Sequence, residues 1–446
     1  MDLFDAISKR VCKIAVFGLG HVGTTIAGIF ADHGFTVVGY DVNGKVVKIV
    51  ASEKLKLPEK ELAEIVNGAV KSGKLSTTLD SSRTVKSCDI IIISVQTPIS
   101  KKHKPNLAFL RSACKAIGQA IEPGKLIIIE STVPPRTTER VALILENMSG
   151  LKCGKDFWLS YCPERLTPGS SATDFVKNEK IIGGIDMHSA RLAGHLYSQV
   201  VKGKIILTDS LSAEIAKLAE NTFRSVNIAF ANELALICEQ YKVDIQEVIK
   251  LANTHPRVNI HMPGCGVGGP CLPKDPYLLL SEVKQNPVRS MIKCSMRLNS
   301  FMESHTLSMI LFALRRVRKD IGKSRISVLG VTYKKGVSDT RCAPSKFIIQ
   351  GLLKLGARVN VYDPLSTESF DGTRCAEPYE AIARTDCLVI LTDHDEFSSL
   401  DLLKVKEIMN EPACIVDGRR KIDPAIAESI GVKYYGIGFG SKNEIV

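Results

Sequence analysis

The stretch KIAVFGLGHVGTTIAGIFADHGFTVVGYDVN, residues 13 to 43, contains the pattern from which the fold follows. A short apolar run of β type leads into a glycine turn, and a stretch with helical periodicity and a second apolar run come next. The glycines are Gly18, Gly20 and Gly23, spaced as G-x-G-x-x-G. This order of features predicts a β-α-β unit with two parallel strands.

The glycine turn also predicts a dinucleotide site. The first glycine allows the tight turn, the second lets a pyrophosphate approach the backbone, and the third lets helix and strand pack closely. Asp41 lies eighteen residues beyond Gly23, at the end of the second strand. Its carboxylate suits a ribose diol and repels the extra phosphate of NADP, so we expect NAD. A flavodoxin-like or nucleotide-free turn is the alternative.

The rest of the chain repeats this alternation twice, with a helical segment between. Strands are expected at Ile90 to Val95, Lys125 to Glu130, Phe157 to Tyr161 and Lys180 to Gly183. Helices are then expected at Ala213 to Tyr241, Gln246 to Ala252 and Pro287 to Arg318. A second alternating region begins at Arg325 and includes a helix from Pro344 to Leu355. We therefore predict an α/β protein with two Rossmann-like, doubly wound domains, 1–204 and 321–446, joined by a long central helical segment, 205–320.

Composition excludes several classes of protein. The 446 residues are 45% hydrophobic and 24% charged, as in folded globular chains, and exceed one core of roughly 150 residues. The start, MDLFDAISKR, lacks a signal peptide, and the apolar runs are too short for membrane helices, so we expect a cytoplasmic protein with no membrane partner. The thirteen cysteines show neither disulfide nor metal-ligand spacing. The net charge of +12 suits anionic partners, but no nucleic-acid motif is present.

The loop PGCGVGGPCLPKDP, residues 263 to 276, is a candidate reactive site. Its glycines remove side chains from around Cys271, which would let a substrate carbon reach the sulfur. Lys274 is positioned to lower the pKa of the thiol, and Asp275 to hold that lysine or a water molecule. The alternative is that Cys271 is one more buried thiol in a turn.

The segment AEIAKLAENTFR, residues 213 to 224, supplies a second candidate set. Lys217 and Asn221 are four residues apart and Glu214 is three before Lys217, so all three share one helix face. A lysine and an amide side by side suit an alkoxide or a polarised carbonyl. An exposed polar stripe with a Glu–Lys pair is the alternative.

With these motifs the chain resembles the UDP-sugar 6-dehydrogenases, the group that includes UDP-glucose and UDP-N-acetylmannosamine dehydrogenases, over nearly its whole length. The matching segments, in chain order, are GLGHVG (18–23), VQTP (95–98), ESTVPPRTT (130–138), CPERLTPG (162–169), AEIAKLAENTFR (213–224), NELA (232–235), HPRVNIHMPGCGVGGPCLPKDP (255–276), GVTYKKGVSDTR (330–341), VYDP (361–364), TDHDEF (392–397) and VDGRR (416–420).

The resemblance implies oxidation of a primary alcohol, sugar C6, to a carboxylate in two NAD-dependent steps through a thiohemiacetal and a thioester on the cysteine. The catalytic residues that it implies are Cys271, Lys217, Asn221, Asp275, Glu164 and Thr132. The implied cofactor contacts are Gly18, Gly20, His21, Val22, Gly23, Asp41, Thr97 and Thr132. The implied substrate contacts are Glu164, Arg165, Lys217, Asn221, Arg257, Gly268, Lys334 and Arg419.

The resemblance also implies a homodimer through the long central helix. The string HPRVNI favours UDP-N-acetylmannosamine as substrate, and UDP-glucose or another UDP-N-acetylhexosamine stays open. A two-electron dehydrogenase of the β-hydroxyacid type and a non-enzymatic NAD-binding scaffold are rival classes. Three residues depart from the family pattern, which usually has glycine at Arg136, often glutamate at Cys342, and proline or a small residue at Cys265. A Cys265–Cys271 disulfide under oxidation is a further hypothesis.

Overall fold

The computed structural model describes residues 1–55, 57, 59–167, 169–283 and 290–440, and the chain forms two compact units. The N-terminal unit comprises Met1–Glu220 and Tyr277–Lys284. The C-terminal unit comprises Asn221–Pro276 and Gln285–Val446. The boundary falls inside one unbroken helix, α10 (Ser210–Tyr241), which confirms the long central helix.

The described residues of the N-terminal unit include an eight-stranded sheet in the order β3-β2-β1-β4-β5-β6-β7-β8. Its strands are β1 (Lys13–Phe17), β2 (Thr36–Tyr40), β3 (Leu75–Thr78), β4 (Ile90–Ile93), β5 (Leu126–Ile129), β6 (Trp158–Tyr161), β7 (Lys180–Gly184) and β8 (Ile205–Asp209). The strand order reverses between β1 and β4, as in dinucleotide-binding folds. Neighbouring strands are parallel except at β6 and β7, where the sequence did not predict an antiparallel pair.

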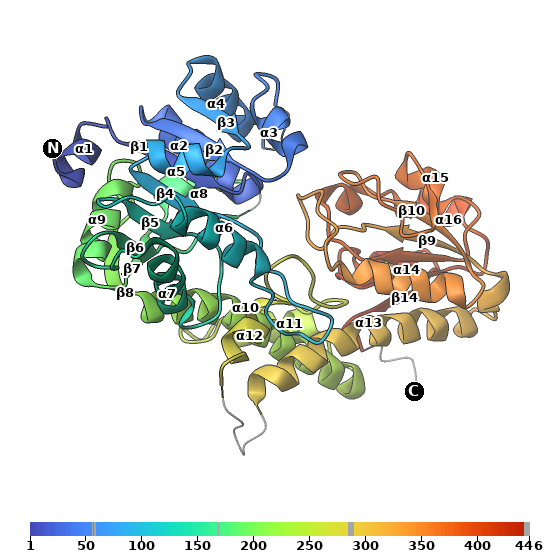
Figure 1. Ribbon diagram of the computed structural model, residues 1–446. Helices are drawn as coiled ribbons and strands as arrows, with labels where there is room; N and C mark the ends of the chain where they lie inside the picture. The colour runs from blue at the N-terminus through green and yellow to red at the C-terminus, as the bar shows by residue number, and fades with distance from the viewer. Residues whose placement is uncertain (56, 58, 168, 284–289, 441–446) are drawn as a thin grey trace. The chain divides into compact units, whose positions relative to one another are not determined.

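Alternate residues of each strand supply the two faces of this sheet. Ile14 and Val16 pack on one side, and Ala15 and Phe17 on the other. Figure 1 shows α6 and α7 on the second side. The helices of this unit that precede α10 are α1 (Leu3–Ser8), α2 (His21–Asp32), α3 (Gly44–Val50), α4 (Lys60–Lys71), α5 (Ser81–Ser87), α6 (Ala108–Gly118), α7 (Thr137–Ser149), α8 (Ser171–Lys177) and α9 (Met187–Tyr197).

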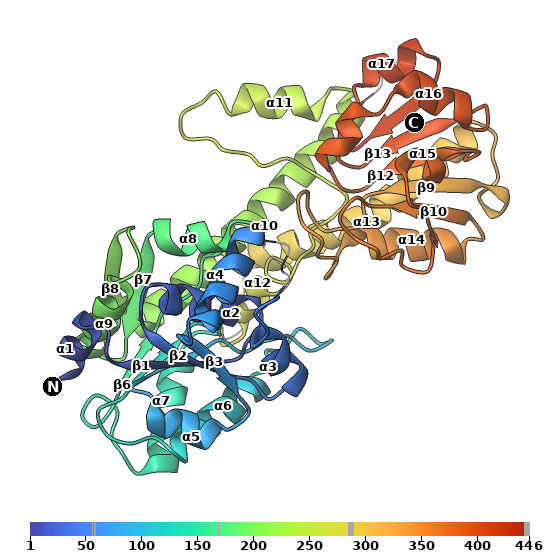
Figure 2. The same cartoon turned by 90° about the horizontal axis from the view of Figure 1, so that it is seen from above.

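The C-terminal unit has a parallel sheet with the same kind of order, β11-β10-β9-β12-β13-β14. Its strands are β9 (Arg325–Leu329), β10 (Arg358–Tyr362), β11 (Thr373–Arg374), β12 (Cys387–Ile390), β13 (Cys414–Asp417) and β14 (Lys433–Gly436). Helices α13 (Met291–Arg316) and α14 (Pro344–Lys354) cover one face. Helices α15 (Pro378–Ile382), α16 (Leu402–Ile408) and α17 (Pro424–Ser429) cover the other (Figure 2).

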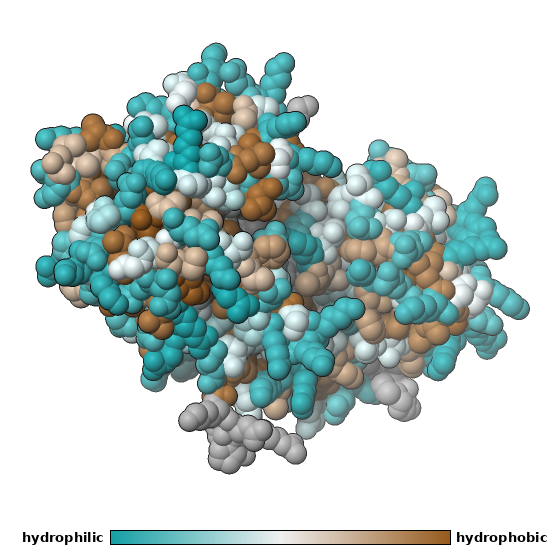
Figure 3. All heavy atoms as spheres, in the orientation of Figure 1, coloured by the Kyte–Doolittle hydropathy of each residue, from teal (hydrophilic) through white to brown (hydrophobic). Residues whose placement is uncertain are grey.

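Four shorter elements complete the described chain: α11 (Ile245–Ala252), α12 (Asp275–Leu280) and the 3-10 turns η1 (Ile321–Lys323) and η2 (Asp395–Ser399). The start of the helix that we expected from Pro287 lies outside the described residues, and α13 begins at Met291. Both units leave some apolar side chains exposed among polar ones (Figure 3). In the described ranges no helix combines the length and apolar character needed to cross a membrane.

Candidate active site

The glycine turn between β1 and α2 has the geometry of a phosphate cradle. Gly18 has φ +94°, and a methyl group built on it would lie 2.4 Å from the carbonyl oxygen of Ser94. A methyl group on Gly23 would lie 1.8 Å from the carbonyl oxygen of Gly18. One built on Gly20 meets nothing within 4 Å, and α2 has no side-chain cap. The turn therefore leaves open space at a helix N-terminus, which fits a pyrophosphate.

The other residues expected around the cofactor divide into backbone and side-chain candidates. Asp41 follows β2, and its carboxylate accepts hydrogen bonds from the N–H groups of Leu19 and Asn43, both at 2.8 Å. The side chain of His21 points to α8, where Nε2 lies 2.8 Å from Ser171 Oγ. Val22 packs against the core of the N-terminal unit. His21 and Val22 can therefore meet a phosphate through their backbone N–H groups.

Two loops at the carboxyl ends of β4 and β5 are joined by hydrogen bonds. Thr97 Oγ1 donates to the carbonyl oxygen of Thr132 at 2.6 Å. Ser131 Oγ accepts from Val95 N at 2.9 Å and donates to Val95 O at 2.7 Å. The structure thus brings the two expected threonines together. Ser131 was missed, although its place beside Thr132 at a strand end was a usable signal.

The N-terminal half of α10 holds the loop that carries the CPER segment. Lys217 Nζ donates to the carbonyl oxygen of Glu164 at 2.5 Å and lies 3.6 Å from its Oε1. Arg165 donates to both carboxylate oxygens of Glu220, at 2.5 and 3.3 Å. Lys217 and Glu164 are therefore neighbours, whereas the guanidinium of Arg165, expected at the substrate, is engaged by α10.

The burial and the contacts of Glu214 contradict the alternative that this face of α10 is an exposed polar stripe. Glu214, Lys217 and Asn221 are 0, 5 and 3% exposed, so this face of α10 is not an exposed polar stripe. Glu214 does not pair with Lys217. Its Oε1 accepts hydrogen bonds from both N and Oγ1 of Thr138, each at 2.7 Å.

Behind the loops after β5 and β6 lies a buried charged cluster that the sequence analysis missed. Glu130 is fully buried, and its Oε1 accepts hydrogen bonds from Lys180 Nζ, at 2.8 Å, and from the Tyr197 hydroxyl. Burial raises the pKa of Glu130, although Lys180 and Tyr197 act in the opposite direction. Lys180 also lies over the Tyr197 ring, 4.6 Å from its centroid. No local sequence signal links these residues, because they come from the end of β5, from β7 and from α9.

Within the C-terminal unit, Asn221 and Asp275 are direct partners. Asn221 Nδ2 donates to Asp275 Oδ2 at 2.5 Å, and Arg224 Nη2 donates to Asn221 Oδ1 at 2.6 Å. The side chain of Asp275 is fully buried and lies 3.6 Å from Lys274 Nζ. The amide expected from α10 and the carboxylate expected from the glycine loop therefore meet, although 54 residues separate them.

Cys271 lies in the turn that precedes α12 and is partly exposed. Its carbonyl oxygen accepts hydrogen bonds from the N–H groups of Lys274 and Asp275, both at 2.9 Å. A methyl group on Gly268 would lie 2.7 Å from Tyr333 Cβ, and one on Gly269 would lie 2.9 Å from Cε2 of the same ring. The glycines therefore also make room for Tyr333, a contact that the sequence analysis did not predict. The cysteine loop packs against the loop after β9.

The glycine loop also packs against a basic residue expected at the substrate. A methyl group on Gly264 would lie 2.3 Å from Arg419 Nη1, and Arg419 pairs with Asp393 at 3.2 Å. Cys265 is 3% exposed, and its Sγ donates to Leu391 O at 3.4 Å. Burial raises the pKa of the Cys265 thiol to about 11. None of the cysteines in the described chain forms a disulfide.

The remaining expected substrate residue of the second sheet lies at its carboxyl edge. Lys334 follows β9 in a loop whose backbone is held by Asp363 and His394. Asp363 Oδ2 accepts from Val331 N at 2.7 Å, and His394 Nε2 lies 3.2 Å from the same oxygen. Arg257 stands apart from these groups in sequence, in an exposed loop after α11.

One departure from the family pattern has a backbone consequence. Arg136, where the family usually has glycine, has φ +64°, in the left-handed region that glycine adopts at lower cost. Arg136 precedes α7, and its side chain pairs with Glu139 at 3.3 Å. The loop thus keeps the conformation that a glycine would favour.

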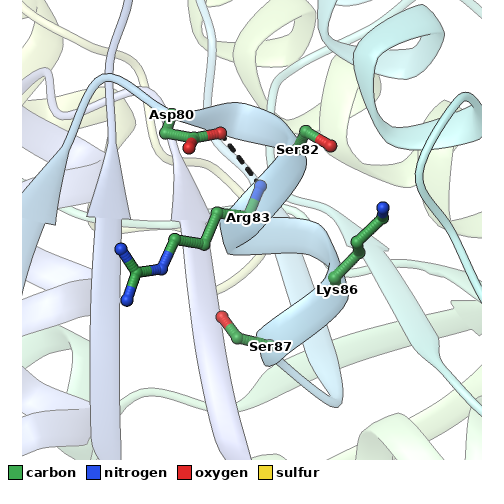
Figure 4. Close-up of a pocket in the computed structure, with 5 residues that line it drawn as sticks. All are labelled: Asp80, Ser82, Arg83, Lys86 and Ser87. Carbon is green, nitrogen blue, oxygen red and sulfur yellow. Dashed lines mark hydrogen bonds between the residues drawn. The ribbon is translucent and has the colours of Figure 1, made fainter.

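One surface hollow lies outside this set of residues. It has a volume of about 460 Å³ and lies along α5, lined by Asp80, Ser82, Arg83, Lys86 and Ser87 (Figure 4). Asp80 accepts a hydrogen bond from Arg83 N, the usual role of a helix N-cap. No expected site residue lines the hollow. The described residues contain no cluster of metal-ligating side chains.

Three family models match consecutive parts of the chain. Residues 12–201 match the NAD binding domain of the UDP-glucose/GDP-mannose dehydrogenase family, residues 211–300 its central domain, and residues 327–424 its UDP binding domain. Together they extend over most of the sequence; the first range contains β1 to β7, and the third contains β10 to β13.

Individual proteins are similar over nearly the whole chain. A UDP-N-acetyl-D-mannosamine dehydrogenase from Pyrococcus horikoshii is 41% identical over 428 residues, covering 96% of this chain and 99% of that protein. A solved structure of a UDP-D-ManNAc dehydrogenase from the same organism has a TM-score of 0.90 at 40% identity, with 96 and 99% coverage. An NDP-N-acetyl-D-galactosaminuronic acid dehydrogenase from Methanosarcina mazei has a TM-score of 0.85 at 32% identity, with 99 and 98% coverage.

Proposed function

The chain belongs to the UDP-glucose/GDP-mannose dehydrogenase family, and we propose that its substrate is UDP-N-acetyl-D-mannosamine, oxidised at C6 to the uronic acid. It is an NAD-dependent oxidoreductase that acts on a CH–OH group of a UDP-sugar. The matching UDP binding domain argues against the β-hydroxyacid type, which needs no second nucleotide-binding domain. The presence of Lys217, Asn221, Cys271 and Asp275 argues against a scaffold with a degenerate site. UDP-glucose and other UDP-N-acetylhexosamines are the competing substrates.

The choice of sugar rests on the similar proteins, and the observation that carries the proposed site of oxidation is the packing of the cysteine loop on the UDP-binding sheet. Tyr333 fills the space beside Gly268 and Gly269, and Arg419 fills that beside Gly264. Because Lys334 lies next to Tyr333 in the same loop, two cations and the Cys271 loop belong to one packed region of the C-terminal unit. Fixed cations suit a diphosphate, which would bring the sugar of the same molecule to the thiol.

We assign the cofactor to the turn between β1 and α2. Gly18, Gly20 and Gly23 and the start of α2 would hold the pyrophosphate, and Asp41 the ribose. Thr97 and Thr132 would line the nicotinamide side. Bound NAD would accept one hydride in each of the two oxidations.

The residues of the chain then act on the sugar carbon. After the first oxidation, the Cys271 sulfur attacks the aldehyde carbon and forms a thiohemiacetal, while Lys217 and Asn221 stabilise the oxygen. The second oxidation gives a thioester. Water, ordered by Asp275 and Glu164, attacks the thioester carbon, breaks the C–S bond and releases the acid and the thiol. Arg257 and Arg165 are proposed substrate contacts, Arg165 with its guanidinium held by Glu220.

The test is the yield of NADH from a panel of UDP-sugars. With UDP-N-acetyl-D-mannosamine we expect two NADH per substrate and the highest kcat/KM of the panel, which includes UDP-glucose and UDP-N-acetylgalactosamine. Cys271→Ser should bind NAD normally and form no net acid, whereas Cys265→Ser, at the buried thiol of the same loop, should keep its turnover. One NADH per substrate, or unchanged turnover of Cys271→Ser, would refute the thioester route.

We also propose a homodimer through α10. Phe223, Phe230 and Ile237 recur every seven residues on this helix, with exposed fractions of 61, 51 and 42%. Such a stripe suits a second helix. We further propose that residues 205–320 serve as the dimerisation segment between the functional domains 1–204 and 321–446. Cysteines that form no disulfide among the described residues suit a reducing compartment, and we propose the cytoplasm.

A further inference from the structure

The first turn of α7 is capped by a residue from a distant part of the chain. Arg136, at the N-cap position, provides no side-chain cap. The first N–H groups of a helix need acceptors, and Glu214 of α10, 76 residues from Thr138, provides one. Its Oε1 takes both the N–H and the hydroxyl of Thr138 at 2.7 Å. The contact therefore ties α7 to α10.

This tie extends to the loop that is expected to meet the cofactor. Thr137 Oγ1 donates to Pro134 O at 2.6 Å, which closes the turn before α7. At the other end of the loop, Thr97 Oγ1 donates to Thr132 O at 2.6 Å. The segment from Thr132 to Thr138 is therefore held at one end by the loop after β4 and at the other end by Glu214.

On α10, Glu214 stands just under one turn before Lys217. Lys217 is itself bound to the backbone of Glu164 at 2.5 Å. Helix α10 therefore joins two loops of the N-terminal unit, one carrying Thr132 and the other carrying Glu164. Removing Glu214 would release the α7 end of the first loop and leave the second loop attached.

We propose that Glu214 is a positioning residue for the dehydrogenase reaction, because it fixes the loop that carries Thr132 relative to Lys217. The inference rests on the roles proposed above for Thr132 and Lys217. A displacement of about 1 Å between reacting groups can cost roughly 100-fold in rate, so loss of this contact should lower kcat more than binding.

This positioning role does not require Glu214 to be charged. The carboxyl is 0% exposed, and its Oε2 has no hydrogen-bond partner among the described residues. Burial raises its pKa to about 7, and the hydrogen bonds from Thr138 oppose this rise. Near neutral pH both protonation states are populated, and Oε1 can accept in either. Glutamine keeps such an oxygen, so Glu214→Gln is the conservative variant.

The experiment compares full-length wild type with Glu214→Ala, Glu214→Gln and the control Glu139→Ala, an exposed acid on the same turn of α7. Steady-state NADH formation with a turned-over UDP-sugar gives kcat and KM, calorimetry gives the Kd of NAD, and a thermal scan gives Tm. We expect Glu214→Ala to lose about 10- to 100-fold in kcat well below its Tm, with KM and Kd within about twofold. Glu214→Gln and Glu139→Ala should stay within about twofold of wild type.

The outcomes are distinguishable. Wild-type kcat in Glu214→Ala, even with a lower Tm, would overturn the inference and leave a simple helix cap. If Glu214→Ala does not fold, Thr138→Val provides the test, because it removes the hydroxyl donor at nearly constant volume. We expect Thr138→Val to lose at least about threefold in kcat. An unchanged kcat would overturn the inference. If the wild-type enzyme reduces NAD with none of the UDP-sugars tested, the proposed function is overturned, and this inference with it.

Discussion

Lys180 and Glu130 form a buried ion pair whose disruption has a calculable cost. The Lys180 and Glu130 side chains are 7 and 0% exposed, with Nζ and Oε1 2.8 Å apart. Lys180→Met would leave an ionised carboxylate in the interior with only the Tyr197 hydroxyl to stabilise it. Stranding one partner of a buried pair typically costs about 3–5 kcal/mol. At roughly 2–4 °C per kcal/mol, the unfolding of the N-terminal unit should shift down by roughly 6–20 °C at pH 8.5.

The loss of stability in Lys180→Met should grow as pH rises. Burial already raises the pKa of Glu130, and loss of Lys180 raises it further. Because the folded state then holds a proton that the unfolded state loses above about pH 4.3, stability falls as pH rises. The slope is about 1.4 kcal/mol per pH unit up to the folded pKa. Near pH 5 the variant should therefore lie within about 1 kcal/mol of wild type.

The assay is differential scanning calorimetry of wild type, Lys180→Met, Glu130→Gln with Lys180→Met, and Lys125→Met, from pH 5 to pH 8.5. The double variant should recover most of the loss, because no charge remains buried. Lys125 is the matched control, since it is also buried but, among the described residues, donates only to the carbonyl oxygens of Lys86 and Cys88. Its deficit should not vary with pH. An equal deficit for Lys180→Met at both ends of the range would refute the reasoning.

Three further outcomes follow from the contacts. Gly20→Ala should leave the Tm of the apo-enzyme unchanged yet weaken NAD binding at least about tenfold, because its methyl group enters the pyrophosphate space. Gly23→Ala should lower both the Tm and the affinity for NAD. Equal Tm values for the two variants would contradict this reasoning. Asp244 and Arg420 form an ion pair in which only the arginine side chain, 3% exposed, is buried. Asp244→Ala leaves that arginine without its partner and should destabilise the C-terminal unit by about 3 kcal/mol, whereas Arg420→Met should cost about 1 kcal/mol. Denaturation scans that show the reverse order would argue against this reasoning. Phe230→Arg should yield monomers in light-scattering chromatography, and an unchanged mass would exclude this face as the interface.

Much of the architecture could be predicted from local patterns. The apolar runs around the glycine turn predicted β1, α2 and β2, because strand and helix periodicities depend only on which residues must be buried. Helix α10 was expected from Ala213 and begins at Ser210. The antiparallel β6–β7 pair was missed, since the direction of a strand within a sheet leaves no trace in its own residues.

The candidate site shows the same division. The spacing of Lys217 and Asn221 on one helical face follows from the sequence, because it depends only on helix geometry. Their partners do not: Asn221 meets Asp275 across 54 residues, and Lys217 meets Glu164 across 53. The burial of the polar face of α10 could not be predicted either, because its exposure depends on which loops pack against it.

By itself, the sequence determined the two nucleotide-type sheets, the long helix and the glycine turn, and it predicted Cys271 as the reactive thiol, because all of these depend on short-range spacing and residue type. Only the tertiary structure decided that Glu214 caps α7, that Tyr333 fills the space beside the cysteine-loop glycines, and that Glu130 and Lys180 share a buried site. Those contacts join segments distant in the chain, and a buried polar group takes whichever partner the folded chain brings within hydrogen-bond distance.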